Sequence, residues 1–354
     1  MKVKTWAARA AAVLLAVAAG AVTAGAPAQA AVPDRFGFAL WSGGVVSQAF
    51  PSTTSVSPGV PGRWIVKFPG QGIVGGVVHV TAVHDALTSP NGRFCQAESW
   101  GPDTSIPPNE IVRVACYRTT GVLDPAPGFS VQFSRSSGGI GGGLYGYMHN
   151  TAACGIITNY TTLGFGTTCS HIGVGQYQVG FTGLSTAGPQ DGGVQVTAVN
   201  PGSAARCKVS NWLSSANGQF FNILCVNHFG ALADNAFTST YQFKRSLYGP
   251  AFPPNRFGYI WNGPGAAPAN NFNSIFGSNG LGGAAPVWSI KYYQLAASLP
   301  GNAQVTAYSN SASFCGLHKP WSTAGTDILM QVNCFDNAGV PITSGFISSY
   351  SSQA

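Results

Sequence analysis

The chain has 354 residues, of which only 8% are charged, whereas about 25% is usual in soluble globular proteins. Its formal net charge of +7 comes from lysines and arginines that are scattered along the sequence, so neither a nucleic acid nor an anionic membrane is predicted as a partner. We expect a surface that is polar but mostly uncharged.

Residues 1–30 have the pattern of a signal peptide. Three basic residues, at positions 2, 4 and 9, precede an Ala/Val/Leu run and an Ala-Gln-Ala cleavage sequence that ends at Ala30. No later stretch approaches the roughly 20 apolar residues that a membrane-spanning helix needs. The sequence therefore predicts a protein that is secreted after cleavage near Ala30 and has no transmembrane segment.

Two cysteines and a tryptophan recur three times after this leader. The second cysteines, Cys116, Cys225 and Cys334, follow one another at equal intervals of about 110 residues, and such a period indicates a triplicated domain. The first cysteines and the tryptophans after them are Cys95 and Trp100, Cys207 and Trp212, and Cys315 and Trp321. We expect each tryptophan to pack near the disulfide of its own domain. The predicted domains, called unit 1, unit 2 and unit 3 below, are residues 31–136, 144–246 and 255–354.

Each unit carries the same succession of short apolar runs. In unit 1, Val78, Val80 and Ala82 lie on one face of an extended chain, with His79 and Thr81 on the other. This period of two residues predicts a half-buried strand. The equivalent triplets are Val80-Thr81-Ala82, Val196-Thr197-Ala198 and Val305-Thr306-Ala307.

Each unit contains about six or seven such runs, separated by Gly, Pro, Asn and Ser turns, and no apolar stripe with helical spacing follows the leader. Short alternating strands with an internal disulfide and a nearby tryptophan are typical of immunoglobulin-like domains. The predicted fold is all-β, with three tandem immunoglobulin-like antiparallel β-sandwich repeats. Small β-barrels are the alternative.

All eight cysteines are expected to form disulfides in an exported chain. A bond that is present in every unit must join equivalent cysteines, which leaves the two extra cysteines of unit 2 for each other. Each repeated bond closes a loop of about 20 residues and contributes on the order of 3 kcal/mol. The predicted pairs are Cys95–Cys116, Cys207–Cys225, Cys315–Cys334 and Cys154–Cys169.

The motifs occur in a fixed order: aromatic-Gly-aromatic, Trp-x-Val-x-Phe-Pro-Gly, Val-His-Val-Thr-Ala and Cys-Lys-Val-x-x-Trp, with their fullest matches at Trp64–Gly70, Val78–Ala82 and Cys207–Trp212. This order resembles a tandem repeat of secreted actinobacterial and myxobacterial proteins, and the resemblance covers essentially the whole chain after the leader. It departs at Gln96–Ser99 and at Gly316–Trp321, where one residue is added. That family has no settled activity, so the resemblance implies a secreted bacterial β-domain and no particular chemistry.

Ionisable residues do not recur between the units, since His79 aligns with Gln195 and Gln304. The shared residues are therefore expected to form the core, and function is expected where the units differ. A histidine near carboxylates is the minimum for general acid/base chemistry. The catalytic candidates of this kind are His84, Asp85 and Glu98 in unit 1. The sequence has no nucleophile motif and no metal-binding spacing, so neither a cofactor nor a metal is expected.

The two extra cysteines of unit 2, Cys154 and Cys169, enclose a segment rich in polar and aromatic residues. A loop closed by a disulfide has lost part of its ordering cost before it binds, which favours recognition. The alternative is that the bond only staples a long loop. The binding candidates in and after this segment are Asn159, Tyr160, Phe165 and His171.

These features predict a secreted, disulfide-stabilised, non-catalytic binding protein that presents loops to an extracellular polysaccharide or protein. One alternative is an extracellular hydrolase or lyase that degrades a polymer, with its site in unit 1. The other is an inhibitor of extracellular proteases, with the Cys154 to Cys169 segment as the inhibitory element.

Overall fold

The structure is a computed structural model that describes residues 34–84, 92–136, 143–186, 190–248, 256–263, 268–296 and 300–352. All of them belong to the part of the chain from Val32 to Ala354. The predicted signal peptide, Asp85 and most of both linkers between the units lie outside the described residues.

The described residues form 26 β-strands in three sheets and no helix, which confirms the all-β class. The part of the chain that the structure describes thus has no helix of the length and apolarity needed to cross a membrane. The strands of unit 1 are β1 (Arg35–Ser42), β2 (Val45–Phe50), β3 (Ser55–Pro58), β4 (Arg63–Phe68), β5 (Val77–Val83), β6 (Arg93–Pro102), β7 (Glu110–Arg118) and β8 (Gly128–Arg135).

The other two units also consist of strands joined by turns. Unit 2 contains β9 (Leu144–Asn150), β10 (Ile156–Thr161), β11 (Thr167–Gly173), β12 (Gln176–Thr182), β13 (Gly193–Val199), β14 (Ala205–Ser215), β15 (Gly218–Asn227) and β16 (Ala236–Phe243). Unit 3 contains β17 (Phe257–Asn262), β18 (Pro268–Asn273), β19 (Gly280–Ala284), β20 (Val287–Tyr292), β21 (Gly301–Tyr308), β22 (Phe314–Leu317), β23 (Ser322–Ala324), β24 (Asp327–Phe335), β25 (Pro341–Ile342) and β26 (Gly345–Ser352).

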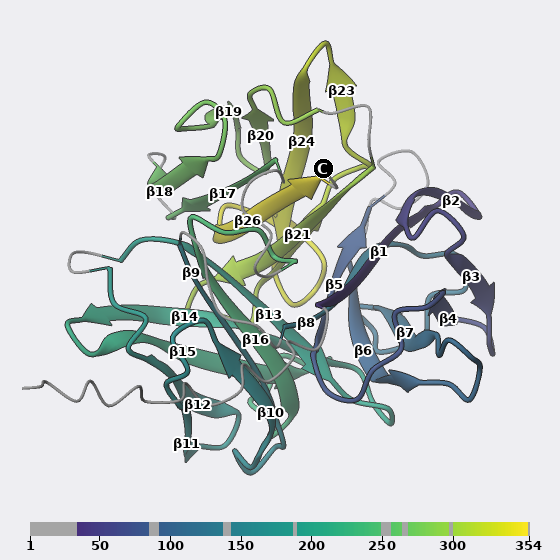
Figure 1. The fold of residues 1–354 in the computed structure, drawn as a ribbon, viewed down its shortest axis with the longest axis horizontal. Coiled ribbons are helices and arrows are strands. Elements are labelled where there is room, and N and C mark those ends of the chain that lie inside the picture. Colours follow the sequence, from purple (N-terminus) through teal and green to yellow (C-terminus); the bar gives the residue numbers. More distant parts are fainter. Residues whose placement is uncertain are drawn as a thin grey trace, which may run out of the picture. The chain divides into compact units, whose positions relative to one another are not determined.

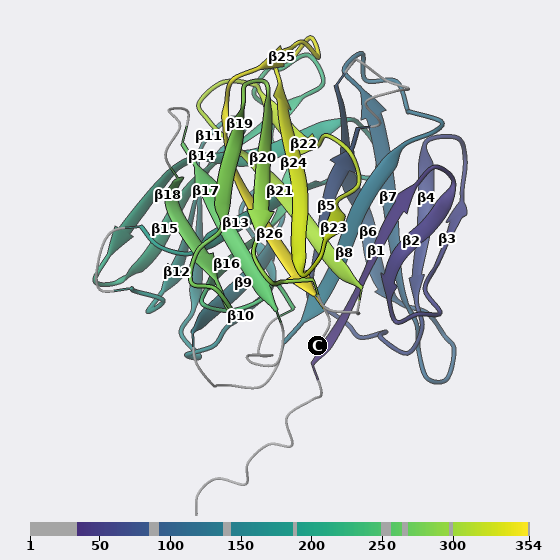
Figure 2. The ribbon, with the colours of Figure 1, turned by 90° about the horizontal axis from the view of Figure 1, so that it is seen from above.

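Every sheet takes its strands from two units (Figure 1, Figure 2). Sheet A runs β19-β20-β24-β22-β5-β8-β1-β2, with β23 and β25 also paired to β24, and so joins unit 3 to unit 1. Sheet B runs β10-β9-β16-β13-β6-β7-β4-β3 and joins unit 2 to unit 1. Sheet C runs β11-β12-β15-β14-β21-β26-β17-β18 and joins unit 2 to unit 3. Each unit therefore contributes to two sheets and shares one with each of the other units.

The units meet in short parallel strand pairs, which we call seams. They pair β5 with β22 in sheet A, β6 with β13 in sheet B, and β14 with β21 in sheet C. One backbone hydrogen bond at each seam occupies an equivalent position: His84 N to Leu317 O at 2.7 Å, Asn200 N to Ala97 O at 2.9 Å, and Ser309 N to Val209 O at 3.1 Å. The sheets are consequently mixed, whereas the sequence predicted antiparallel sheets confined to their own units.

The core of each unit lies between two sheets. In unit 1, Val80 and Phe129 of sheet A belong to the same buried cluster as Val66 and Val114 of sheet B. The disulfides of the structure join the pairs that the repeat spacing predicts: Cys95–Cys116, Cys154–Cys169, Cys207–Cys225 and Cys315–Cys334.

The three tryptophans differ in burial. Trp212 and Trp321 are buried in the cores of their own units, as expected. Trp100 is only half-buried, and its ring lies 4.5 Å from that of His149, so it also contacts unit 2.

The strands with the Val-Thr-Ala triplets, β5, β13 and β21, are buried on both faces. The prediction that they are half-buried is wrong, because their polar faces meet the other units instead of water. At this meeting point a threonine hydroxyl from each unit accepts a hydrogen bond from a backbone N–H of another unit. The bonds are Val80 N to Thr197 Oγ1 at 3.1 Å, Val196 N to Thr306 Oγ1 at 2.9 Å, and Val305 N to Thr81 Oγ1 at 2.9 Å.

These three bonds, which we call the threonine ring, lead from unit 1 to unit 2, from unit 2 to unit 3, and from unit 3 back to unit 1. Two of the hydroxyls also donate to a glutamine: Thr81 to Gln304 and Thr306 to Gln195, both at 2.8 Å. The third threonine, Thr197, has a histidine as its neighbour instead of a glutamine. Nδ1 of His79 lies 3.3 Å from the Thr197 hydroxyl. The ring thus satisfies polar groups that are completely removed from water.

We expect Thr306→Val to lower the free energy of unfolding by about 1 to 3 kcal/mol, because the buried Val196 N–H and the Gln195 oxygen would lose their partner. Chemical denaturation measures the change. Thr306→Ser, which keeps the hydroxyl, should recover most of it, and Thr323→Val on the exposed strand β23 should change little. A Thr306→Val protein as stable as the parent would show that the ring contributes nothing to stability.

Candidate functional site

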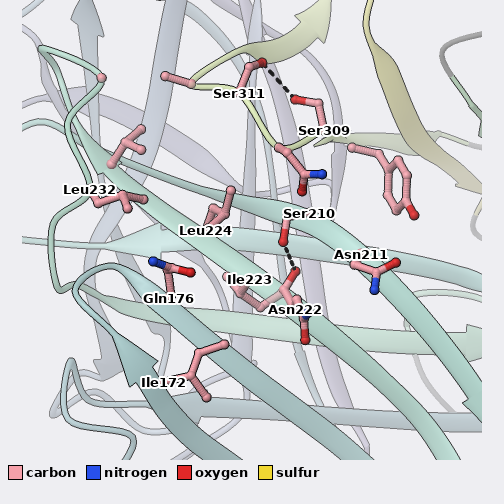
Figure 3. Close-up of a pocket in the computed structure, with 15 residues that line it drawn as sticks. Ile172, Gln176, Ser210, Asn211, Asn222, Ile223, Leu224, Leu232, Ser309 and Ser311 are labelled. Atoms are coloured by element: carbon pink, nitrogen blue, oxygen red, sulfur yellow. Dashed lines mark hydrogen bonds between the residues drawn. The ribbon is translucent and has the colours of Figure 1, made fainter.

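An open groove of about 810 Å³ lies on the outward face of sheet C in unit 2. Its floor is formed by β12, β15 and β14, and its far side is formed by the last residue of β21 in unit 3 and the turn that follows it, residues 308–312 (Figure 3). The groove therefore crosses the seam between β14 and β21. No single unit contains all of it.

The alternation along the strands explains why this face is polar. Tyr177, Val179 and Phe181 of β12 point into the core of unit 2. The alternate residues, including Gln176 and Gln178, point outward, as side chains of successive strand residues must. The same alternation in β15 buries Phe221 and Ile223 and leaves Asn222 and Leu224 facing the groove.

Amide side chains form a row on the outward face of sheet C, and two of them, Asn222 and Asn211, line the groove. Gln178, Asn222 and Asn211 are direct neighbours on β12, β15 and β14. Gln178 Nε2 approaches Asn222 Oδ1 at 3.5 Å. Within the described residues, the side-chain amides of Gln176 and Asn211 have no hydrogen-bond partner, so their donors and acceptors are free for a ligand.

The remaining lining is hydroxylic or apolar. Ser309 and Ser311 share a hydrogen bond of 3.1 Å at the unit 3 side. Ile172, Leu224 and Leu232 form an apolar end of the groove (Figure 3). None of the lining residues is charged, so the groove suits an uncharged ligand with both polar and apolar surfaces.

The equivalent outward faces of the other units have a different charge. The positions of Gln178 and Asn222 are taken by Ile65 and Arg113 in unit 1, since both pairs face each other across neighbouring strands. In unit 3 a pocket of about 420 Å³ on this face contains Lys291. The neutral amide row is therefore specific to unit 2.

The structure does not bring together the two catalytic candidates that it describes, His84 and Glu98, and the third, Asp85, lies outside the described residues. His84 follows β5 in sheet A, is buried against Phe335 with ring centroids 4.6 Å apart, and has a pKa lowered to about 3 by burial. Glu98 lies in β6 of sheet B, where it accepts a hydrogen bond from Arg63 Nε at 2.7 Å. Burial raises the pKa of Glu98 despite that arginine. Among the described residues, no hydrogen bond or ion pair joins His84 to Glu98, and no three His, Cys, Asp or Glu residues are placed to hold a metal.

The segment from Cys154 to Cys169 is largely strand, in contrast to the predicted loop. It forms β10 at the edge of sheet B and the beginning of β11 at the edge of sheet C, and its disulfide links the two edges. Units 1 and 3 have strands at the same places, β2 and β3, and β18 and β19. The bond therefore joins two sheets at the border of unit 2.

The binding candidates in this segment lie outside the groove. Asn159 donates to the Thr167 hydroxyl at 2.8 Å, and Tyr160 stacks on Tyr147 with centroids 5.5 Å apart. Phe165 is 55% exposed. His171 lies beside the groove residue Ile172, but its Nε2 is 2.8 Å from a carboxylate oxygen of Asp234.

Glu110 in β7 is an ionisable residue that the sequence did not single out. Its side chain is completely buried, and only one of its oxygens has a partner, the backbone N–H of Ile73 at 3.0 Å. Burial raises the pKa of Glu110 to about 8. Unit 2 has Gln219 at this place, six residues before its second cysteine, and there it accepts a hydrogen bond from Trp212. The position thus favours an uncharged side chain.

Comparison of the chain with protein-family models, with curated proteins and with solved structures finds no match.

We expect Glu110→Gln to stabilise the protein increasingly as the pH rises. Because folding raises this pKa to about 8, the native protein holds the proton more tightly than the unfolded chain, and the parent loses stability between roughly pH 4.5 and 8. The loss is on the order of 1.4 kcal/mol for each unit of the pKa rise. Denaturation at pH 5 and pH 9 measures it.

Asp234→Asn is the control, because this variant should change the pH dependence of stability in the opposite direction. The backbone N–H of Gly175 and the ring of His171 lower the pKa of Asp234, so its contribution is present above the unfolded pKa and disappears in acid. If Glu110→Gln gave the same stability difference at pH 5 and pH 9, the carboxyl would be ionised in the folded protein and the assignment would be wrong.

Proposed function

We propose that this protein is a secreted, non-catalytic binding protein whose unit 2 groove holds an uncharged polysaccharide. The observation that carries the proposal is the groove lining, which has amide and hydroxyl groups, an apolar end and no charged side chain. Four disulfides and a signal-peptide-like leader support export. Each unit is inferred to be an immunoglobulin-like β-sandwich, since each core lies between two sheets.

The chemistry of a neutral sugar chain complements this lining. Sugar hydroxyls both donate and accept hydrogen bonds, and an amide side chain offers both functions. Gln176, Asn222 and Asn211 present such amides to the groove from three strands. The C–H faces of a sugar ring require apolar contacts, which Ile172, Leu224 and Leu232 supply.

Among the described residues, neither alternative has a comparable site. A hydrolase or lyase in unit 1 would need His84 near Glu98, but His84 follows β5 of sheet A whereas Glu98 lies in β6 of sheet B. A protease inhibitor needs an extended loop that enters the protease, whereas most of the Cys154 to Cys169 segment is paired in β10 and β11. The differing faces of units 1 and 3 also argue against three equal sugar sites.

We expect the double variant Gln176→Ala and Asn211→Ala to bind neutral polysaccharides about 5- to 150-fold more weakly, because each lost hydrogen bond contributes roughly 0.5 to 1.5 kcal/mol. Affinity electrophoresis in gels that contain neutral or charged polysaccharides measures the dissociation constants. Melting temperatures of parent and variant should agree, since both side chains are partly exposed.

The matched control is the double variant Ser289→Ala and Gln331→Ala, which removes neighbouring polar side chains from the same face of unit 3. It should bind as the parent does. The proposal would be wrong if both double variants retained full affinity, or if the parent bound only charged polysaccharides or a protein.

A further inference from the structure

Two basic side chains of unit 2 are buried where the three units meet. Arg206 and Lys208 lie on β14 with exposed fractions of 7% and 4%. Cys207 between them points into the core of unit 2, so alternation places both basic side chains on the opposite face, toward the other units. Fully buried arginine and lysine are rare in proteins unless they are paired.

Both residues line a cavity of about 50 Å³. Its wall contains the Val-Thr-Ala triplets of all three units and the first cysteines Cys95, Cys207 and Cys315. The cavity therefore adjoins the threonine ring. It is far below the roughly 300 to 1,000 Å³ of pockets for organic ligands, which restricts an occupant to one or a few atoms.

The guanidinium of Arg206, which lines this cavity, has hydrogen-bond donors without a partner. Its guanidinium lies between the rings of Phe94 and Phe314, at 4.8 and 4.7 Å from their centroids. One terminal nitrogen, Nη2, donates to the Asn227 carbonyl at 3.3 Å and to the side-chain oxygen of Asn337. Nε and Nη1 are buried and have no partner among the described residues. Leaving charged donors unsatisfied in the interior is costly.

The Lys208 ammonium has hydrogen-bond partners, but none of them carries a negative charge. Its ammonium donates to the Ser309 hydroxyl at 2.7 Å and to the carbonyl and hydroxyl of Ser313, both at 3.1 Å. All three acceptors are neutral. No described carboxylate forms an ion pair with Lys208 or with Arg206. Burial and the charge of Arg206 lower the pKa of Lys208 to about 7.

We propose that the cavity binds a monovalent anion of halide size, with chloride as the occupant. The anion would accept hydrogen bonds from the free N–H groups of Arg206 and would offset the buried charges of Arg206 and Lys208. Small size selects a halide over sulfate, phosphate or a carboxylated sugar. The bound ion would therefore be a structural component of the junction between the units.

The other units provide matched substitutions. The positions of Arg206 and Lys208, immediately before and after the first cysteine, are occupied by Phe94 and Gln96 in unit 1. Unit 3 has Phe314 in the first of these positions. Arg206→Phe and Lys208→Gln therefore introduce side chains that the same strand position already holds elsewhere in the chain.

The test compares thermal melting of the whole mature protein at pH 6 and constant ionic strength in sodium chloride, bromide, sulfate and gluconate. We expect a saturable rise in melting temperature with chloride and bromide, and none with gluconate or sulfate. Crystals grown in bromide should show an anomalous difference peak in the cavity beside Arg206. Stabilisation by sulfate alone, or a cavity that holds only water in bromide, would overturn the proposal.

Arg206→Phe should abolish the halide-dependent rise, and Lys208→Gln should reduce it. Lys319→Gln, which removes an exposed charge in unit 3, should leave the rise unchanged. A full rise in Arg206→Phe would place the halide elsewhere and contradict the proposal. If Arg206→Phe does not fold, the bromide peak and the Lys208→Gln melting curve still decide.

Discussion

The threonine ring is the interaction on which the arrangement of the three units depends. The central strands have polar side chains on the face that their own unit does not cover, and burying such groups without partners would cost several kcal/mol. Each partner comes from another unit, as in the bond from Val80 N to Thr197. Separating one unit from the other two would therefore leave polar groups in all three units without their hydrogen-bond partners. It would also break the strand pairing of two sheets.

Much of the fold follows from short-range sequence patterns, and the rest depends on contacts between units that such patterns do not contain. Alternation around Val78 correctly predicts a strand, and the cysteine period predicts the disulfides. The same alternation predicts that the polar face with His79 and Thr81 is exposed to water, because the sequence of a single strand does not distinguish water from a buried polar neighbour. Packing against strands of unit 2 encloses that face, since the ring nitrogens of His79 lie 3.3 Å from the Thr197 hydroxyl on β13 and 2.6 Å from the Thr240 hydroxyl on β16.

The candidate groove could not be predicted from the sequence for the same reason. Asn211 and Ser309 belong to different units and meet only because β14 pairs with β21. His84 and Glu98, the catalytic candidates predicted from the sequence, have perturbed pKa values. Burial at the seams is the main cause of both pKa shifts. A signal was present in the unit alignment, since Arg113 of unit 1 is replaced by Asn222, a change toward neutrality at one outward position.

The closed order of the seams has a consequence for how such a chain is able to evolve. In a linear array each copy touches only its neighbours, so duplication adds copies without limit. Here the last unit pairs back with the first, as sheet A joins units 3 and 1. A fourth copy would have to open a sheet and widen the meeting point of β5, β13 and β21, which contact one another directly. An added unit of this kind would thus disrupt the existing junction, whereas a change on an outward face would leave the three seams intact.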